Sequence, residues 1–234
     1  MTGSPAPRIA TNPLTPLSRP LVPSAKPPSC TPPAPSSRQA SPRWLRGRAP
    51  ILLHWSALLT EHAFTPSTLP VLLDETDGAP VLRFHLSAAN AATSALMAGS
   101  NALIVFTGNH AYVSPDWYGQ DDEVGTWNYL SVEAEGPVTH LDDAGATRLL
   151  DDLSDLFEAG LSPKPAWTRA KMTPGRFEAM LSGIRAFSLT PTRFEGITKL
   201  SQNKPPSARQ GVITALSAFE DGIAIAEEMR KHQP

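Results

Sequence analysis

Flat, hydrogen-bonding side chains are concentrated in one stretch of a chain that is otherwise poor in aromatic residues. The segment NHAYVSPDWYGQDDEVGTWNYLSVEAEG, residues 109–136, holds two of the five tryptophans and all three tyrosines. Aromatic residues on strands usually pack a core. Here histidine, serine and asparagine lie on or beside the same predicted strands. A heteroaromatic ligand needs this mixture, because its rings require an apolar slot and its edges require directional partners, so the segment suits an isoalloxazine.

A second polar cluster, KLSQNK at residues 199–204, has two interpretations. Lys199 could supply a point charge and Ser201 a hydroxyl to a phosphate or a ring edge. Four polar residues at a strand end are equally typical of an exposed loop, and spacing alone leaves both interpretations open.

The other residues that could do chemistry form no recognisable catalytic set. The histidines have no acidic or histidine partners at metal-ligand spacing, so we expect no metal site. The G-x-S-x-G, P-loop and G-x-G-x-x-G motifs do not occur, so hydrolase, nucleoside-triphosphatase and Rossmann interpretations lack their local signatures. We therefore predict no catalytic residue.

Composition and charge divide the chain into a basic tail and an acidic body. Residues 1–50 hold 13 of the 25 prolines, which prevent regular structure, and no acidic residue precedes Glu61. We expect residues 1–48 to be a disordered tail and residues 49–234 to be one domain. The tail is either a flexible basic arm or an altered start of the coding sequence. The seven bases before Glu61 leave a net charge of −9 on the remainder, since the whole chain carries −2.

The length of the apolar runs and the number of cysteines bear on cellular location. No apolar run approaches the ~20 residues that a membrane span needs. The single cysteine, Cys30, cannot form an internal disulfide. We expect a cytoplasmic protein with no membrane association.

Apolar periodicity predicts a mainly β fold with added helices. Five short apolar or alternating segments separated by turn residues predict a barrel: ILLHWSALLT, STLPVLLDE, APVLRFHLS, NALIVFTG and TWNYLSVEAEG. Helices are predicted at AANAATSALMAG (ending at Gly99), LDDAGATRLLDDLSDLFEAG, and TPGRFEAMLSGI, with Thr173 as N-cap and Pro174 first. RAFSLTPTRFEGITKLSQN predicts a late strand with a turn. The C-terminal segment predicts helix with a break near Gly222.

Three ordered motifs, HAYVSPDWY, TWNY and KLSQNK, resemble the signature segments of the PaiB family, and the likeness runs from about residue 51 to 216. That family is described as FMN-binding negative transcriptional regulators, associated with repression of protease synthesis and sporulation genes. The resemblance implies an FMN-binding split β-barrel with peripheral helices and a C-terminal helical segment. It also implies a homodimer with FMN near the subunit interface, and a flavin-responsive regulator rather than an enzyme.

The alternative function is an FMN-dependent oxidoreductase or flavin reductase of the split-barrel class, because the cofactor itself carries hydride chemistry. Direct DNA binding is a separate question. A repressor normally presents bases to phosphates, whereas the predicted domain is acidic, so we expect that domain to bind DNA weakly at most.

The resemblance carries over a set of flavin-binding positions and also shows departures from the family pattern. An arginine of the family is Ala88 here, a histidine is Thr68 and a proline is Gly125, while the tail replaces the usual opening. The missing arginine removes one candidate phosphate partner. The implied FMN site comprises His85, Ser87, Asn90, Tyr112, Ser114, Trp117, Tyr118, Trp127, Asn128, Lys199, Ser201, Gln202 and Asn203.

Overall fold

Period-two burial shapes the longest strand of the protein, β7, Thr126–His140. Every second residue from Asn128 to Val138 is buried, so one face of the strand packs inward and the other faces out. The other strands are β1 Gln39–Ala40, β2 Ser56–Thr60, β3 Ala63–Leu69, β4 Leu72–Thr76, β5 Ala79–Ser87, β6 Asn101–Val113, β8 Ile184–Leu189 and β9 Arg193–Lys199.

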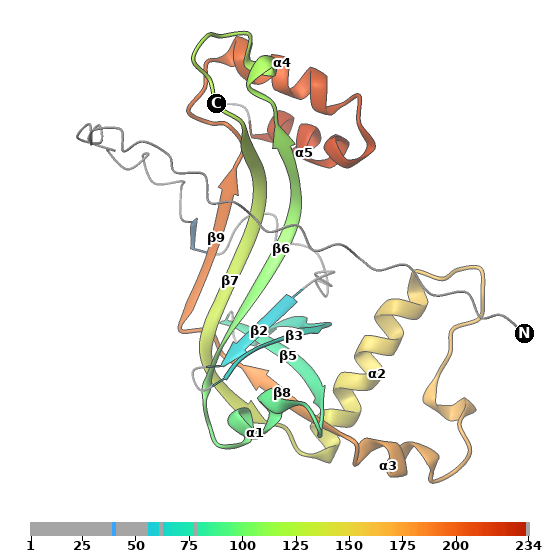
Figure 1. Cartoon of the computed structure of the whole chain (residues 1–234). Helices are drawn as coiled ribbons and strands as arrows, with labels where there is room; N and C mark the ends of the chain where they lie inside the picture. Colours follow the sequence, from blue (N-terminus) through green and yellow to red (C-terminus); the bar gives the residue numbers. More distant parts are fainter. Residues whose placement is uncertain (1–38, 41–55, 61–62, 77–78, 233–234) are drawn as a thin grey trace, which may run out of the picture. The chain divides into compact units, whose positions relative to one another are not determined.

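The structure is a computed structural model that describes residues 39–40, 56–60, 63–76 and 79–232 (Figure 1). The predicted boundary at residue 49 and the start of the first predicted strand, residues 51–55, lie outside this range. So does the predicted tail, except for β1, which pairs with β9. The division into tail and domain stays a prediction.

The described strands form one antiparallel sheet in which β7 is the central member. The hydrogen-bonded path runs β3-β2-β6-β7-β8-β5-β4, and β9 pairs with β7. One edge of β7 is shared, because β9 pairs with residues 129–135 and β8 with residues 138–140. Phe84, Phe106 and Phe187, on three different strands, belong to the same buried core. A sheet that encloses a core while β3 and β4 remain unpaired to each other has the arrangement expected of a split barrel.

Local sequence explains where the first two helices begin and end. In α1, Ala91–Met97, the Asn90 side chain accepts a hydrogen bond from the Ala92 backbone at 2.9 Å. The helix is followed by Gly99 with φ of +87°, a conformation that favours glycine. In α2, Asp143–Ala159, Asp142 caps the helix, and one stripe packs on the outer face of the sheet.

Two predictions about helix boundaries are wrong. The helix predicted to start at Thr173 and Pro174 begins at Arg176 (α3, Arg176–Leu181), because Gly175 is the N-cap residue with φ of +78°. The predicted break near Gly222 falls earlier, between α4, Pro206–Leu216, and α5, Glu220–Lys231. Gly222 lies inside α5, where a Cβ would come within 2.4 Å of the Leu216 carbonyl oxygen.

A second core lies where α4 and α5 cover the inner face of the β6, β7 and β9 ends (Figure 1). It includes Val113, Leu130, Leu200 and Met229, together with Tyr118 from a short 3-10 helix, η2, Pro115–Tyr118. A further 3-10 helix, η3, spans Arg169–Lys171. The predicted class, a mainly β fold with peripheral helices and a C-terminal helical segment, is confirmed. None of the helices in the described ranges is long and apolar enough to cross a membrane.

Candidate functional site

A buried hydrogen-bond network joins the three sequence motifs. The Ser201 hydroxyl donates to Oδ1 of Asn128 at 3.1 Å and lies 3.0 Å from the Tyr118 hydroxyl. The Asn128 amide in turn donates to the sulfur of Met229 on α5 at 3.4 Å. The motif residues are each at most 5% exposed, so their polar groups are satisfied by one another. Residues far apart in sequence therefore hold the ends of β6, β7 and β9 together.

Local hydrogen bonds hold the KLSQNK segment in a tight turn after β9. Ser201 has φ of +56°, and the Gln202 side chain bonds the backbone of Leu200 and Thr198 at 2.7 and 2.6 Å. Lys204 pairs with Glu123, and its Nζ lies 4.9 Å from the centre of the Tyr118 ring. Asn203 is exposed at the turn. The segment is a turn whose middle residue is buried in the network, and its contact with a phosphate or ring edge stays a prediction.

The opposite face of the same strands presents aromatic rings to solvent. Tyr112 and Trp127 are directly opposed on β6 and β7 and are 49% and 52% exposed. Trp127 lies edge-to-face with both His110 and Tyr112, at centroid distances of 5.8 and 6.1 Å. The exposed rings of Trp127 and Tyr112 lie side by side and form an apolar surface, so this aromatic face is the leading candidate for ligand contact.

Lys199 adds a positive charge beside the aromatic face. It lies opposite Tyr129, its Nζ donates to the Thr126 hydroxyl at 2.9 Å, and it lies 5.9 Å from the Tyr129 ring. Within the described ranges no carboxylate forms an ion pair with it. Two strand spacings, about 10 Å, separate the β6 edge from β9. The face therefore offers aromatic surface at one side and an uncompensated cation at the other.

A hollow of about 480 Å³ adjoins the aromatic face at the edge of β6. It lies beside the bulge of β6 between Thr107 and His110, next to Phe106, which pairs with Ser56, the first described residue of β2. Its walls include His110, Tyr112 and Trp127 from the strands and Phe219 and Asp221 from the α5 end. Its volume lies within the range of small-molecule sites, and its walls combine aromatic rings with polar groups.

Trp117 and Ser114 do not line this hollow. Trp117 is half-buried and stacks on Phe219, with ring centroids 6.0 Å apart and planes inclined by 25°. Ser114 occupies the N-cap position of η2 without a side-chain capping bond. Trp117 thus supports a residue that lines the hollow.

The remaining predicted residues, His85, Ser87 and Asn90, lie on β5 and at the start of α1. The pKa of His85 is lowered by burial, and its Nδ1 has no hydrogen-bond partner among the described residues. Asn90 caps α1 and bonds the Ser67 hydroxyl. His85 lies level with the His140 end of β7. It pairs with Ala186 of β8, and the next residue of β8, Phe187, pairs with His140. Along β7, roughly 40 Å of strand separates His140 from Trp127.

The positions at which the chain departs from the family pattern are exposed. Ala88 follows β5, and its backbone N–H donates to the Gly183 carbonyl at 2.9 Å. Thr68 faces solvent on β3. Gly125 precedes β7, beside the Tyr112 ring. Of these three, Gly125 alone borders the aromatic face.

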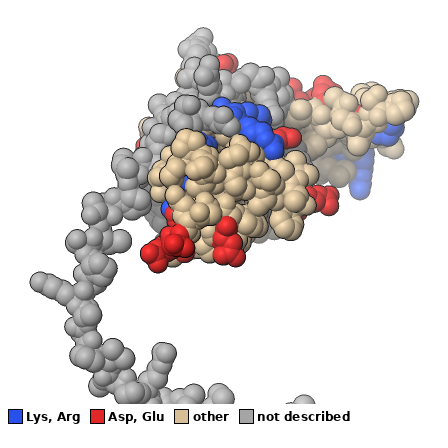
Figure 2. All heavy atoms as spheres, turned by 90° about the horizontal axis from the view of Figure 1, so that it is seen from above, with Lys and Arg blue, Asp and Glu red and all other residues tan. Residues whose placement is uncertain are grey.

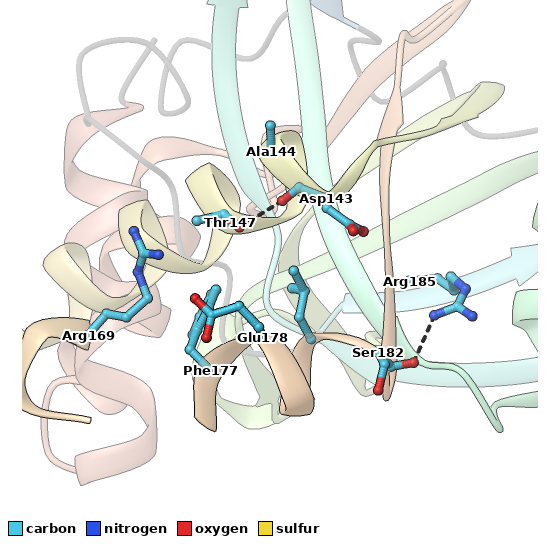
Figure 3. Close-up of a pocket in the computed structure, with 9 residues that line it drawn as sticks. Asp143, Ala144, Thr147, Arg169, Phe177, Glu178, Ser182 and Arg185 are labelled. Carbon is cyan, nitrogen blue, oxygen red and sulfur yellow. Dashed lines mark hydrogen bonds between the residues drawn. The ribbon is translucent and has the colours of Figure 1, made fainter. Parts of the chain in front are cut away.

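A second hollow, of about 460 Å³, lies between α2, α3 and the start of β8 (Figure 3). Its charged groups are accounted for by local structure. Arg169 is held by two bonds to Asp151 and lies over the Phe177 ring at 4.6 Å. Asp143 and Glu178 occupy the first turns of their helices, where the helix dipole favours acids. No predicted site residue lines this hollow, so we place the candidate site at the aromatic face.

Several residues at the candidate site are not among the predicted FMN-binding positions. His110 and Tyr129 carried a usable signal, since both lie within the aromatic segment of residues 109–136. Phe219 and Asp221 carried none, because only the packing of α5 brings them to the β6 edge.

Comparison with known proteins identifies the family. Residues 54–193 match the family described as "Putative FMN-binding domain". The chain is 28% identical over 153 residues to "Protease synthase and sporulation protein PAI 2" of Bacillus subtilis, covering 65% of this chain and 72% of that protein. It is 29% identical over 151 residues to an uncharacterized protein of Aspergillus fumigatus, covering 55% of this chain and 58% of that protein.

Two solved structures match a large part of this chain. The FAD and heme binding protein from Mycobacterium smegmatis matches with a TM-score of 0.46 and 19% identity, over 70% of this chain and 72% of its own. The flavocytochrome Anf3 from Azotobacter vinelandii matches with a TM-score of 0.45 and 14% identity, over 63% of each chain. Taken with the match over residues 54–193, the sequence motifs place this chain in the PaiB family of FMN-binding domain proteins, with FMN as its cofactor.

Proposed function

We propose that the chain binds FMN at the aromatic face and acts as a flavin-responsive negative transcriptional regulator of the PaiB type. The observation that carries the site is the convergence of all three motifs on the Tyr118–Ser201–Asn128 network, which fixes the strands whose outer face carries Trp127 and Tyr112. The isoalloxazine lies against these two rings and the adjoining hollow. Lys199 is the phosphate partner, because it is a cation within reach and has no ion-pair partner in the described chain.

The regulatory part of the proposal is supported by the relative named for protease synthesis and sporulation. In this proposal the protein acts in the cytoplasm. Bound flavin covers the aromatic face and so changes the surface with which the protein can contact its regulatory partners.

A homodimer completes the proposal. His85, Ser87 and Asn90 lie too far along the sheet from Trp127 to touch the same ring within one copy. With FMN near the interface, one copy can supply Trp127 and Lys199 while the other supplies the β5 end. Light scattering after size exclusion, with and without FMN, should give twice the chain mass of 25.1 kDa. A monomer in both conditions would contradict the shared site.

Direct DNA contact by the α4–α5 end is not part of the proposal. Figure 2, which views the molecule from above, shows mostly uncharged surface among the described residues, with acidic side chains and separate groups of basic side chains towards its rim. α5 contributes Glu220, Asp221, Glu227 and Glu228 and only two bases, Arg230 and Lys231. Phosphates are repelled by such a surface. Nanomolar, sequence-dependent binding of duplex DNA at physiological salt, measured by fluorescence anisotropy, would contradict this.

FMN titration of the purified protein tests the proposal. We expect saturable quenching of flavin fluorescence, with tighter binding of FMN than of riboflavin. The absence of binding at micromolar FMN would reject the site. Oxidation of NADH or NADPH by the FMN-loaded protein, faster than with free FMN, would instead favour an FMN-dependent oxidoreductase or flavin reductase.

A further inference from the structure

The residue that precedes β7 is a glycine on which an aromatic ring rests. A Cβ built on Gly125 would lie 2.2 Å from the Tyr112 hydroxyl oxygen and 2.9 Å from Cζ of the same ring. Real Cβ atoms do not approach other atoms so closely. The tip of the Tyr112 ring therefore occupies the space that any side chain at position 125 would take.

The backbone itself does not demand glycine at this position. Gly99, Gly119 and Gly175 have φ in the left-handed region, whereas Gly125 does not. Gly125 is also exposed. The three atoms nearest to a Cβ built on Gly125 all belong to the Tyr112 ring.

The absence of a side chain at position 125 lets the Tyr112 ring lie beside Trp127, where it completes the aromatic face. Its ring meets Trp127 edge-to-face at 6.1 Å and 67°, and it lines the hollow at the β6 edge. Because the ring is 49% exposed, it has room to swing outward if position 125 gains a side chain. That movement would break the contact with Trp127 and open one wall of the hollow.

We propose that Gly125 is a positioning residue that sets the place of Tyr112 and, through it, the affinity of the aromatic face for flavin. The affinity part rests on the proposed function, whereas the positioning part is a property of the ligand-free protein. Gly125 itself need not touch the flavin. It acts by leaving the ring space in which to lie.

The ligand-free protein tests the positioning. Ring currents between Tyr112 and Trp127 shift their aromatic proton signals, and the Gly125→Ala variant should move these signals towards the values of isolated rings. The melting temperature should remain close to that of the wild type. Gly160→Ala is the matched control, because the nearest atom to its Cβ is 3.5 Å away and it should leave these signals in place. Unchanged Tyr112 and Trp127 signals in Gly125→Ala would overturn the proposal.

The affinity part is tested with a double-mutant cycle. Gly125→Ala should weaken FMN binding roughly fivefold, the usual size of one aromatic contact. The same substitution should have no effect in the Tyr112→Ala background, where there is no ring to displace. Equal weakening in both backgrounds would show that residue 125 acts independently of Tyr112 and would overturn the proposal. If wild-type protein binds no FMN, the proposed function fails, while the proton signals still decide the positioning.

Discussion

The hydroxyl oxygen of Tyr118 lies 3.0 Å from the Ser201 hydroxyl oxygen, although 83 residues separate them. Ser201 uses its only hydroxyl proton on Asn128, so Tyr118 is the donor to Ser201. The chain of bonds thus has one direction, from Tyr118 through Ser201 to Asn128. Because all three side chains are buried, removing one member leaves its neighbours unsatisfied.

The first prediction concerns this network. Ser201→Ala should lower the free energy of unfolding by about 1–3 kcal/mol, because it leaves a buried hydroxyl and an amide oxygen without a partner. Tyr118→Phe should cost about 1 kcal/mol, and the double variant should cost less than the sum. Urea unfolding measures all three. Ser182→Ala, at an exposed position, is the control and should change stability little. Additive costs would show that the two hydroxyls are not coupled.

The second prediction separates the exposed tryptophan of the aromatic face from other exposed tryptophans. Trp127→Ala should weaken FMN binding roughly fivefold or more, through loss of an aromatic contact of about 1 kcal/mol. Trp167→Ala removes a 37% exposed ring from the segment between α2 and α3 and should leave the affinity unchanged. Fluorescence titration checks both. Equal affinities for Trp127→Ala and wild type would move the flavin away from this face.

A third prediction assigns the phosphate contact. Lys199→Ala should bring the dissociation constants of FMN and riboflavin closer together. The substitution removes a contact with the phosphate, which FMN has and riboflavin lacks, so only FMN binding should weaken. The wild-type preference for FMN should also shrink as salt is raised. Lys231→Ala removes the same charge from the end of α5, where Lys231 pairs with Glu228, and serves as the control. If Lys199→Ala weakens FMN and riboflavin equally, the phosphate is held elsewhere.

The fourth prediction follows from the burial of His85, which lowers its pKa below the usual value of about 6.5. Above that value His85 is neutral in both folded and unfolded protein and contributes no pH dependence. As the pH falls below it, the unfolded chain binds the proton first, so stability is lost. The loss continues until the pH reaches the lowered folded-state pKa.

Melting temperatures at pH 7.5 and 5.5 measure this effect. We expect the wild type to lose more stability over this interval than His85→Gln, which cannot be protonated. The variant His140→Gln is the control, because His140 is exposed on β7. An equal loss in wild type and His85→Gln would assign the pH dependence to other groups.

Glycines explain where sequence patterns misjudged strand ends. The segments NALIVFTG and TWNYLSVEAEG were predicted to end at Gly108 and Gly136, yet β6 continues to Val113 and β7 to His140. Gly108 lies at the bulge of β6, and a Cβ on Gly136 would come within 2.3 Å of the Thr190 carbonyl oxygen. Glycine ends many strands, but here it allows a bulge and a close approach between chain segments. Only the packed structure distinguishes these cases.

The sequence by itself indicated the family and most of the elements, but not where those elements end. Alternating burial in β7 and the apolar stripe of α2 depend on neighbouring residues, so local patterns were sufficient. The three motifs together were sufficient to indicate the family. The sequence did not show the separate structural role of each motif.

The tertiary structure decided which motif residues are buried and which face solvent. Tyr112 and Tyr118 belong to the same motif, yet one is half-exposed beside Trp127 and the other is buried against Ser201. Successive side chains of a strand point to opposite faces of the sheet. This alternation does not continue through η2, so it does not predict the side to which Tyr118 points. Which face is covered depends on where α4 and α5 pack, a contact between segments about 100 residues apart, as in the bond from Asn128 to Met229. No local pattern contains that information.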